Sequence, residues 1–155
     1  MIEIERKFLV KSDDFKTNAS KTSRIIQGFL NTDPHRTVRV RVKNNKGILT
    51  VKGLSSEDGL KRFEWEKEIN KTEAKALLDF CEGSIIDKVR YEVNLGDHVF
   101  EIDEFYGDNE GLIIAEIELN HEDEYFSKPD WLGDEVTGNT KYYNSQLCLT
   151  PFKSW

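Results

Sequence analysis

Apolar and charged residues alternate along most of this chain with a period of two, and this pattern limits the possible folds more than any other feature. In one stretch, Val38, Val40 and Val42 alternate with Arg39 and Arg41. Successive side chains of a β-strand point to opposite faces of the sheet, so this period predicts strands with one apolar face and one charged face. The chain is therefore expected to be mainly β.

Turn-forming residues divide the pattern into eight segments, which we expect to be short and mostly antiparallel strands. The expected strands are residues 2–8, 25–30, 37–43, 48–52, 62–69, 85–93, 99–105 and 112–119. Two stretches follow a helical pattern instead: residues 73–81, with Thr72 as N-cap and Gly83 closing the helix, and residues at about 140–149. After His121 the strand pattern stops. These elements predict an α+β architecture, mainly β with flanking helices.

The charged faces are sorted by sign from strand to strand. The acidic residues on them are Glu3, Glu5, Glu64, Glu66, Glu68, Glu92, Glu101, Asp103, Glu116 and Glu118. The basic residues on them are Lys7, Arg39, Arg41, Lys43, Lys52, Arg62, Lys88 and Arg90. Residues two apart on a strand share one face at a spacing of about 6.7 Å. Like charges so placed repel one another unless a bound group of opposite charge lies between them.

A charged face also has an ordinary explanation, because antiparallel sheets commonly present one polar face to water. For any single strand, that explanation is the simpler one. Over all the charged strands together, the sorted signs favour an enclosed site, since carboxylate pairs suit Mg²⁺ or Mn²⁺ and basic side chains bind phosphate oxygens. Eight strands are enough to close a barrel around a small ligand. The apolar stripes would then face outward and need cover from the two helices or from a second subunit.

Composition excludes several other classes of protein. The 155 residues are expected to form a single domain, residues 1–155, and 11% aromatic residues are too many for a disordered chain. A net charge of −7 argues against general nucleic-acid binding, and no apolar run is long enough to cross a bilayer. Cys81 and Cys148 form no CxxC motif, and the charged N-terminus does not resemble a signal peptide. These features predict a cytoplasmic protein without a cysteine-built zinc site.

The ordered set of charged motifs resembles the CYTH, or triphosphate tunnel metalloenzyme, superfamily. Residues Glu3-Ile4-Glu5-Arg6-Lys7 are similar to the ExExK signature of that family. The other motifs follow in the family's order: Arg39-Val40-Arg41, Lys52, Glu64-Trp65-Glu66, Lys88-Val89-Arg90, Glu101-Ile102-Asp103, Glu116-Ile117-Glu118, and an ending that contains Gly133, Thr137, Tyr142 and Asn144. The resemblance covers nearly the whole chain. It implies a closed eight-stranded antiparallel β-tunnel with a charged interior, which binds triphosphate together with Mg²⁺ or Mn²⁺.

The resemblance also implies roles for individual residues. The implied metal ligands are Glu3, Glu5, Glu116 and Glu118, with Asp103 and the pair Glu64 and Glu66 in support. The implied phosphate-binding residues are Lys7, Arg39, Arg41, Lys52, Lys88, Arg90 and Lys141, the last at the start of the C-terminal helix. Lys7 and Lys88 are also counted as catalytic, and Glu64 or Glu66 could take the proton of the attacking water.

The activity favoured by this resemblance is metal-dependent hydrolysis of inorganic triphosphate to pyrophosphate and phosphate. A thiamine or nucleoside triphosphatase, or a class IV adenylyl cyclase, would need an apolar or aromatic pocket near the tunnel mouth. No clear set of such residues is found, although Phe29, Phe105 and Trp131 have no assigned place. A non-catalytic polyphosphate-binding module would tolerate loss of the acids, which are intact here. The outward apolar stripes make a homodimer a reasonable expectation.

Overall fold

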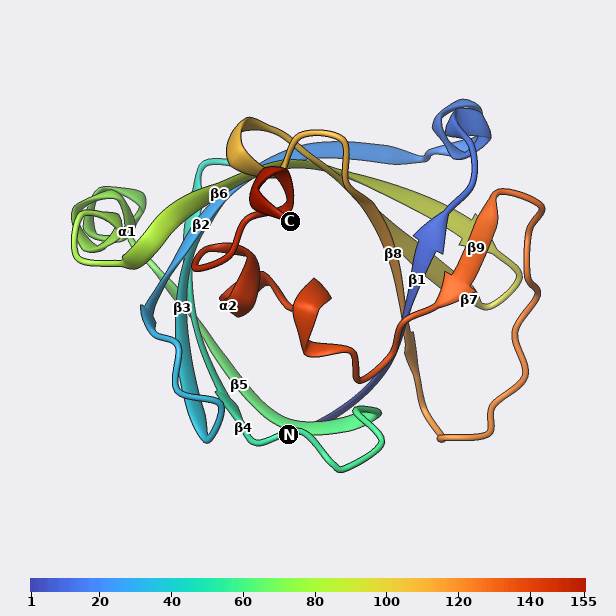
Figure 1. Ribbon diagram of the computed structural model, residues 1–155, viewed down its shortest axis with the longest axis horizontal. Helices are drawn as coiled ribbons and strands as arrows, with labels where there is room; N and C mark the ends of the chain where they lie inside the picture. Colours follow the sequence, from blue (N-terminus) through green and yellow to red (C-terminus); the bar gives the residue numbers. More distant parts are fainter.

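Eight antiparallel strands form a closed β-barrel in the computed structural model, which describes all 155 residues (Figure 1). The strands pair in the order β5-β4-β3-β2-β6-β7-β8-β1, and β1 pairs with β5 to close the ring. Their bounds are β1 (Ile2–Val10), β2 (Lys21–Asn31), β3 (Arg36–Lys43), β4 (Lys46–Gly53), β5 (Lys61–Ile69), β6 (Glu82–Leu95), β7 (His98–Phe105) and β8 (Ile113–Leu119). The predicted eight-stranded antiparallel barrel is confirmed.

One further strand lies outside the ring and is not expected from the sequence. Strand β9 (Leu132–Glu135) pairs with the C-terminal part of β1, where Val10 faces Leu132. The four residues of β9 show no clear alternation of apolar and charged side chains. The strand forms because β1 extends past the end of β5 and leaves an edge available for pairing. The expectation that strand structure stops after His121 is therefore wrong.

Helix α1 (Lys71–Leu78) lies outside the ring and covers the apolar face of β2, β3 and β4 (Figure 1). The helix and the sheet approach closely where Ala74 meets Gly47. A Cβ atom at position 47 would lie 2.7 Å from the Ala74 Cβ, so only glycine fits there. The valine stripe of β3 is covered in this way, and Val40 is fully buried.

The limits of α1 differ from the expected ones. Asn70, not Thr72, is the N-cap, because the Asn70 side chain accepts a hydrogen bond from the Thr72 backbone N–H at 2.7 Å. The helix ends at Leu78, and Gly83 lies within β6 with a φ of +64°. None of the helices is long and apolar enough to span a membrane.

The apolar faces of β1, β6, β7 and β8 also point outward, and short segments cover them. Phe15 of a short 3₁₀ helix after β1 packs there together with Phe126 and Trp131 of the segment before β9. The rings of Phe15 and Trp131 meet edge to face, with centroids 5.9 Å apart. On β5, the side chains of Phe63 and Trp65 stay partly exposed, at 41% and 38%. Both helices were expected to cover the outer apolar stripes, but only α1 does so.

The C-terminal segment crosses one end of the barrel instead of covering its outer face (Figure 1). The helix expected at about 140–149 is divided into the 3₁₀ helix Thr140–Tyr142 and the single-turn α2 (Asn144–Leu147). Tyr143 interrupts it because its backbone is extended, with φ −70° and ψ 136°.

An apolar cluster, here called the end plug, fills this end of the barrel. Its buried residues are Phe29, Ile86, Phe105, Leu112, Ile114, Leu147 and Cys148. Ile86, Phe105 and Ile114 continue the inward faces of β6, β7 and β8 beyond their charged residues. The interior therefore changes from charged to apolar along the barrel axis.

Candidate active site

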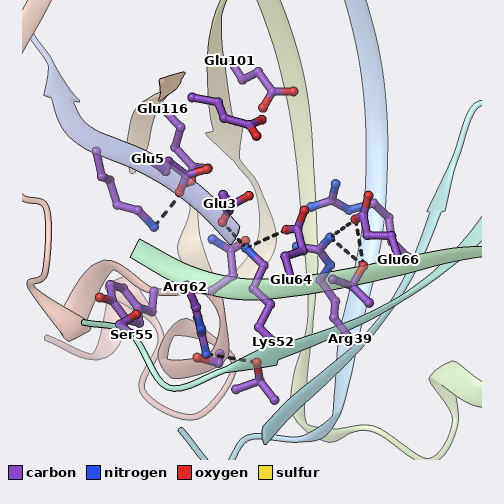
Figure 2. Close-up of a pocket in the computed structure, with 18 of the residues that line it drawn as sticks. Glu3, Glu5, Arg39, Lys52, Ser55, Arg62, Glu64, Glu66, Glu101 and Glu116 are labelled. Carbon is purple, nitrogen blue, oxygen red and sulfur yellow. Dashed lines mark hydrogen bonds and ion pairs between the residues drawn. The ribbon is translucent and has the colours of Figure 1, made fainter. Parts of the chain in front are cut away.

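The charged faces of the strands point into the barrel and line a cavity of about 330 Å³ (Figure 2). Only four of its 27 lining residues are hydrophobic. The acidic lining residues are Glu3, Glu5, Glu64, Glu66, Glu101, Glu116 and Glu118. The basic ones are Lys7, Arg39, Arg41, Lys43, Lys52, Arg62, Lys88 and Arg90. Most of the alternating charges are therefore the wall of an internal site, although Glu68 and Glu92 do not line it.

Glu5 on β1 and Glu116 on β8 form a carboxyl pair that shares a hydrogen bond. Burial raises the pKa of Glu5 well above its usual value, and the negative charge of Glu116 adds to this effect. Burial also acts to raise the pKa of Glu116, but the Lys7 ammonium and the Glu5 hydrogen bond outweigh it and hold that pKa well below its usual value. Two adjacent carboxyl groups that cannot both ionise freely make a strong site for a cation.

A second acidic group surrounds Lys52. The Lys52 ammonium lies 2.9 Å from a carboxylate oxygen of Glu3 and 3.2 Å from one of Glu64 (Figure 2). Burial acts to raise the pKa of Glu3, but Lys52 outweighs it and leaves that pKa below its usual value. Burial raises the pKa of Glu118, and the charges of Glu3 and Glu101 raise it further.

The donor set fits a hard divalent cation that is completed by substrate. No group of three or more histidine, cysteine or carboxylate side chains converges closely enough to hold a metal ion alone. Glu3, Glu5, Glu116 and Glu118 nevertheless come from the paired strands β1 and β8, and all line the cavity. Mg²⁺ commonly binds through one or two carboxylates together with water and substrate phosphates, and Mn²⁺ accepts the same ligands.

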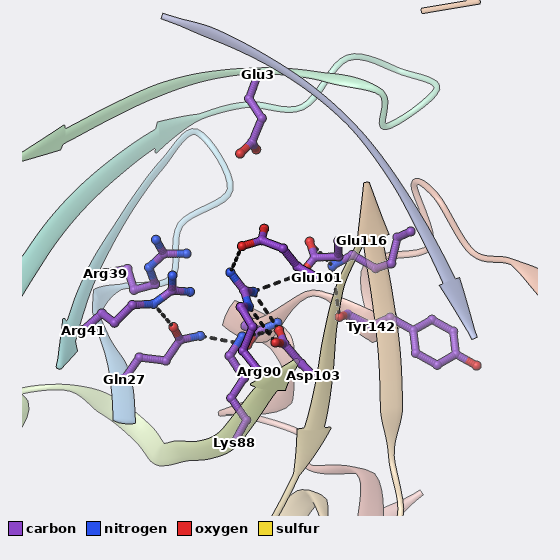
Figure 3. A network of polar contacts seen from close by, with 12 residues as sticks. Glu3, Gln27, Arg39, Arg41, Lys88, Arg90, Glu101, Asp103, Glu116 and Tyr142 are labelled. Atoms are coloured by element: carbon purple, nitrogen blue, oxygen red, sulfur yellow. Dashed lines mark hydrogen bonds and ion pairs between the residues drawn. The ribbon is translucent and has the colours of Figure 1, made fainter. Parts of the chain in front are cut away.

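Asp103, which the sequence placed in support of the metal, is occupied by two cations instead (Figure 3). One of its oxygens lies 2.7 Å from Lys88 Nζ, and Arg90 donates to both oxygens at 2.7 and 2.8 Å. Asp103 is 1% exposed and does not line the cavity. Burial acts to raise its pKa, but Arg90 and Lys88 hold that pKa at about 2. The carboxylate positions two basic side chains and has no free oxygen for a metal.

Lys88 is the most deeply buried of the basic residues, at 1% exposure. Burial, together with the nearby charges of Arg90 and Arg41, lowers its pKa to about 7. The Arg41 guanidinium is also buried, and burial followed by the charge of Arg39 lowers its pKa well below the usual value. Cations this poorly solvated gain strongly from an anion placed between them.

Arg39, on the same strand as Arg41, has free hydrogen-bonding capacity. Its Nη2 donates to Thr50 at 3.0 Å and to Glu66 at 3.2 Å, and Thr50 also donates to Glu66 at 2.9 Å. The Arg39 Nε is buried and has no hydrogen-bond partner. A buried guanidinium N–H without a partner points to a missing acceptor.

Of the predicted phosphate-binding residues, Lys141 alone lies away from the cavity. Its ammonium stands over the Trp155 ring, 3.9 Å from the centroid, and Lys141 does not line the cavity. Arg62 and Asn144, which line the cavity, and Gln27, which donates to Asn144, were not predicted as site residues. Arg62 lines the cavity and shares the alternating face of Glu64, so the pattern contained a signal for it. Gln27 and Asn144 are uncharged, and the charge pattern gave no signal for either.

The comparisons with known proteins agree with this geometry. The family model described as CYTH domain matches residues 1–147. The chain is 48% identical over 154 residues to an inorganic triphosphatase of Acetivibrio thermocellus, covering 99% of this chain and 97% of that one. It is 37% identical over 153 residues to an inorganic triphosphatase of Nitrosomonas europaea, covering 97% and 99%. The crystal structure of the inorganic triphosphatase NE1496 is similar with a TM-score of 0.66 and 33% identity, covering 95% of this chain and 94% of that one. The chain therefore belongs to the CYTH domain family.

Proposed function

We propose that this protein hydrolyses inorganic triphosphate to pyrophosphate and phosphate with Mg²⁺ or Mn²⁺. One observation carries the proposal: the cavity of about 330 Å³ inside the barrel is walled by both carboxylates and buried cations. A polyanion that chelates a divalent cation would neutralise both sets of charges together. The names of the two relatives, at 48% and 37% identity over nearly the whole chain, support the same substrate.

The binding residues divide into two roles in this proposal. Glu3, Glu5, Glu116 and Glu118 would hold the cation, which neutralises phosphate charge and lowers the pKa of an attacking water. The phosphates would be held by Lys7, Arg39, Arg41, Lys52, Lys88 and Arg90. Phosphoryl transfer requires mainly such positioning and charge neutralisation, because little covalent chemistry is asked of the protein.

Glu64 is a better candidate than Glu66 to accept the proton of the attacking water. Glu66 accepts hydrogen bonds from Arg39 and Thr50, which occupy its Oε2. Burial raises the pKa of Glu64, although Lys52 opposes this. A general base with a raised pKa accepts a proton more readily near neutral pH.

The lining favours an inorganic over an organic triphosphate. Of the three aromatic residues without an assigned place, only Phe29 lines the cavity. Phe105 belongs to the end plug, with Lys88 5.4 Å above its ring, and Trp131 lies in the outer core. Tyr143 also lines the cavity, but Lys7 and Arg62 already stand over its ring, at 5.1 and 6.0 Å from the centroid. A base or thiazolium ring would therefore find little free aromatic surface to stack on.

Metal removal tests the proposal directly. Phosphate release from tripolyphosphate is expected to fall to background in EDTA and to return with added Mg²⁺ or Mn²⁺, because the acids cannot neutralise substrate charge without a cation. The assay compares tripolyphosphate, pyrophosphate, ATP and thiamine triphosphate with each metal. Turnover that persists in EDTA would show that the activity does not depend on a metal. Turnover of ATP alone, with cyclic AMP as product, would show that the protein is an adenylyl cyclase and not an inorganic triphosphatase.

Arg39→Ala is expected to weaken substrate binding more than folding. Loss of charge-assisted hydrogen bonds to a phosphate should raise KM by about 10- to 100-fold. Stability should change by less than about 1 kcal/mol, because its partner Glu66 is 44% exposed. Arg36→Ala is the matched control, since Arg36 begins the same strand but lies outside the cavity. Steady-state kinetics and thermal unfolding measure both effects, and an unfolded Arg39→Ala would make this arginine a structural residue.

A further inference from the structure

Three consecutive residues of the C-terminal segment reach the charged interior at the closed end of the barrel. The Tyr142 carbonyl accepts a hydrogen bond from the Lys7 ammonium at 3.4 Å, and the same nitrogen lies 5.1 Å from the centre of the Tyr143 ring. Asn144 follows them and lines the cavity. These contacts join the last part of the chain to cations on β1 and β6.

The Asn144 side chain uses only one of its two polar atoms within the protein. Its Oδ1 accepts hydrogen bonds from Lys88 Nζ at 3.0 Å and from Gln27 Nε2 at 2.8 Å. Both partners are donors, so the atom that receives them must be the oxygen. The Asn144 NH₂ group makes no hydrogen bond within the protein and is not fully buried, and Asn144 lines the cavity. Its N–H donors are therefore free for a ligand.

Gln27, on β2 between β6 and β3, extends this contact to the neighbouring strand β3. It is fully buried, and its Oε1 accepts a hydrogen bond from Arg41 Nε at 2.7 Å (Figure 3). Lys88, Asn144, Gln27 and Arg41 are thus joined in one chain of hydrogen bonds. A buried network whose members are satisfied holds its side chains in one arrangement. Asn144 therefore helps Asp103 to hold Lys88, and it holds Arg41 through Gln27.

We infer that Asn144 is a further substrate-binding residue, which donates an amide N–H to a phosphate oxygen while its carbonyl orients Lys88 and, through Gln27, Arg41. The inference rests on the proposed triphosphatase function. An amide suits this place because it is neutral and carries both a donor and an acceptor. A carboxylate here would repel the phosphate, and an ammonium would repel Lys88.

Asn144→Asp separates the two roles of this side chain. A carboxylate can still accept from Lys88 and Gln27, but it has no N–H for substrate and adds a negative charge. KM for tripolyphosphate is expected to rise by about 10- to 100-fold. Calorimetry of tripolyphosphate binding in EDTA should show the same loss of affinity. The thermal unfolding midpoint and kcat should change little. Asn144→Ala, which also releases Lys88 and Arg41, should raise KM and lower kcat.

Asn18→Asp is the control, because Asn18 is an exposed residue outside the cavity and the substitution adds the same charge. It should match the wild type. If Asn144→Asp keeps the wild-type affinity and KM, the proposed contact between Asn144 and substrate is wrong. If Asn144→Asp does not fold, wild-type affinity in Asn144→Ala would also show that this contact is wrong. A wild type that neither binds nor hydrolyses tripolyphosphate would overturn the proposed function, and the inference with it. A working wild type whose variants match it would overturn the inference alone.

Discussion

Replacing Glu5 with glutamine is expected to lower kcat/KM for tripolyphosphate by at least about 100-fold, because even an outer partner of a metal ligand commonly contributes that much. Glutamine keeps the shape of the side chain but supplies no charged oxygen to a cation. Stability should stay the same or rise, since the substitution removes the unfavourable pairing of two adjacent carboxyl groups, Glu5 and Glu116. Activity as a function of Mg²⁺ concentration, together with thermal unfolding, measures both effects.

Glu73→Gln is the matched control for this experiment. Glu73 is exposed on α1, so the variant loses the same charge outside the barrel and should keep full activity. Full activity in Glu5→Gln would show that the carboxyl pair of β1 and β8 does not hold the cation. A loss of activity that only follows a loss of folded protein would make Glu5 a structural residue.

Asp103→Ala is expected to lower the free energy of unfolding by about 3 to 5 kcal/mol, because it leaves two buried cations, Lys88 and Arg90, without their shared partner. The effect should depend on pH. The pKa of Asp103 is held at about 2 in the folded protein, below the value of 3.8 for a free side chain. Its stabilising contribution is therefore fully present above pH 3.8 and is lost as the pH falls through about 2. Urea unfolding of wild type and variant over this range measures the difference.

Glu101→Gln provides the comparison within the same network. Glu101 is the other close partner of Arg90, at 2.9 Å, but its side chain is 35% exposed. Loss of this pair should reduce stability by less than about 1 kcal/mol. An equal loss for Asp103→Ala and Glu101→Gln would mean that burial does not determine the value of these ion pairs.

The barrel and most of its charged lining could be predicted because one pattern encodes both. A period of two places Arg39 and Arg41 on one face and Val40 on the other in any strand. The repeated like charges on that face are unfavourable unless they enclose a ligand, which made the inward orientation predictable. The same reasoning could not find β9, because its four residues take their conformation from the edge that β1 offers.

Two predicted site residues show where sequence position stops being informative. Asp103 shares a face with Glu101, yet Lys88 and Arg90 occupy its oxygens. Lys141 lies three residues before Asn144, yet its ammonium stands over Trp155 and only Asn144 lines the cavity. Which charges neutralise each other depends on distances between side chains on different strands, and no local pattern contains those distances.

The sequence by itself determined the eight barrel strands, the family and most of the charged wall, because alternation and the order of the motifs are local properties of the chain. Only the tertiary structure decided that the C-terminal segment closes one end of the barrel and brings Asn144 to Lys88 and Gln27. That docking depends on apolar residues such as Ile86, contributed to the end plug by strands far apart in sequence. Burial of such residues is a property of the assembled barrel, because each strand alone leaves them exposed to water.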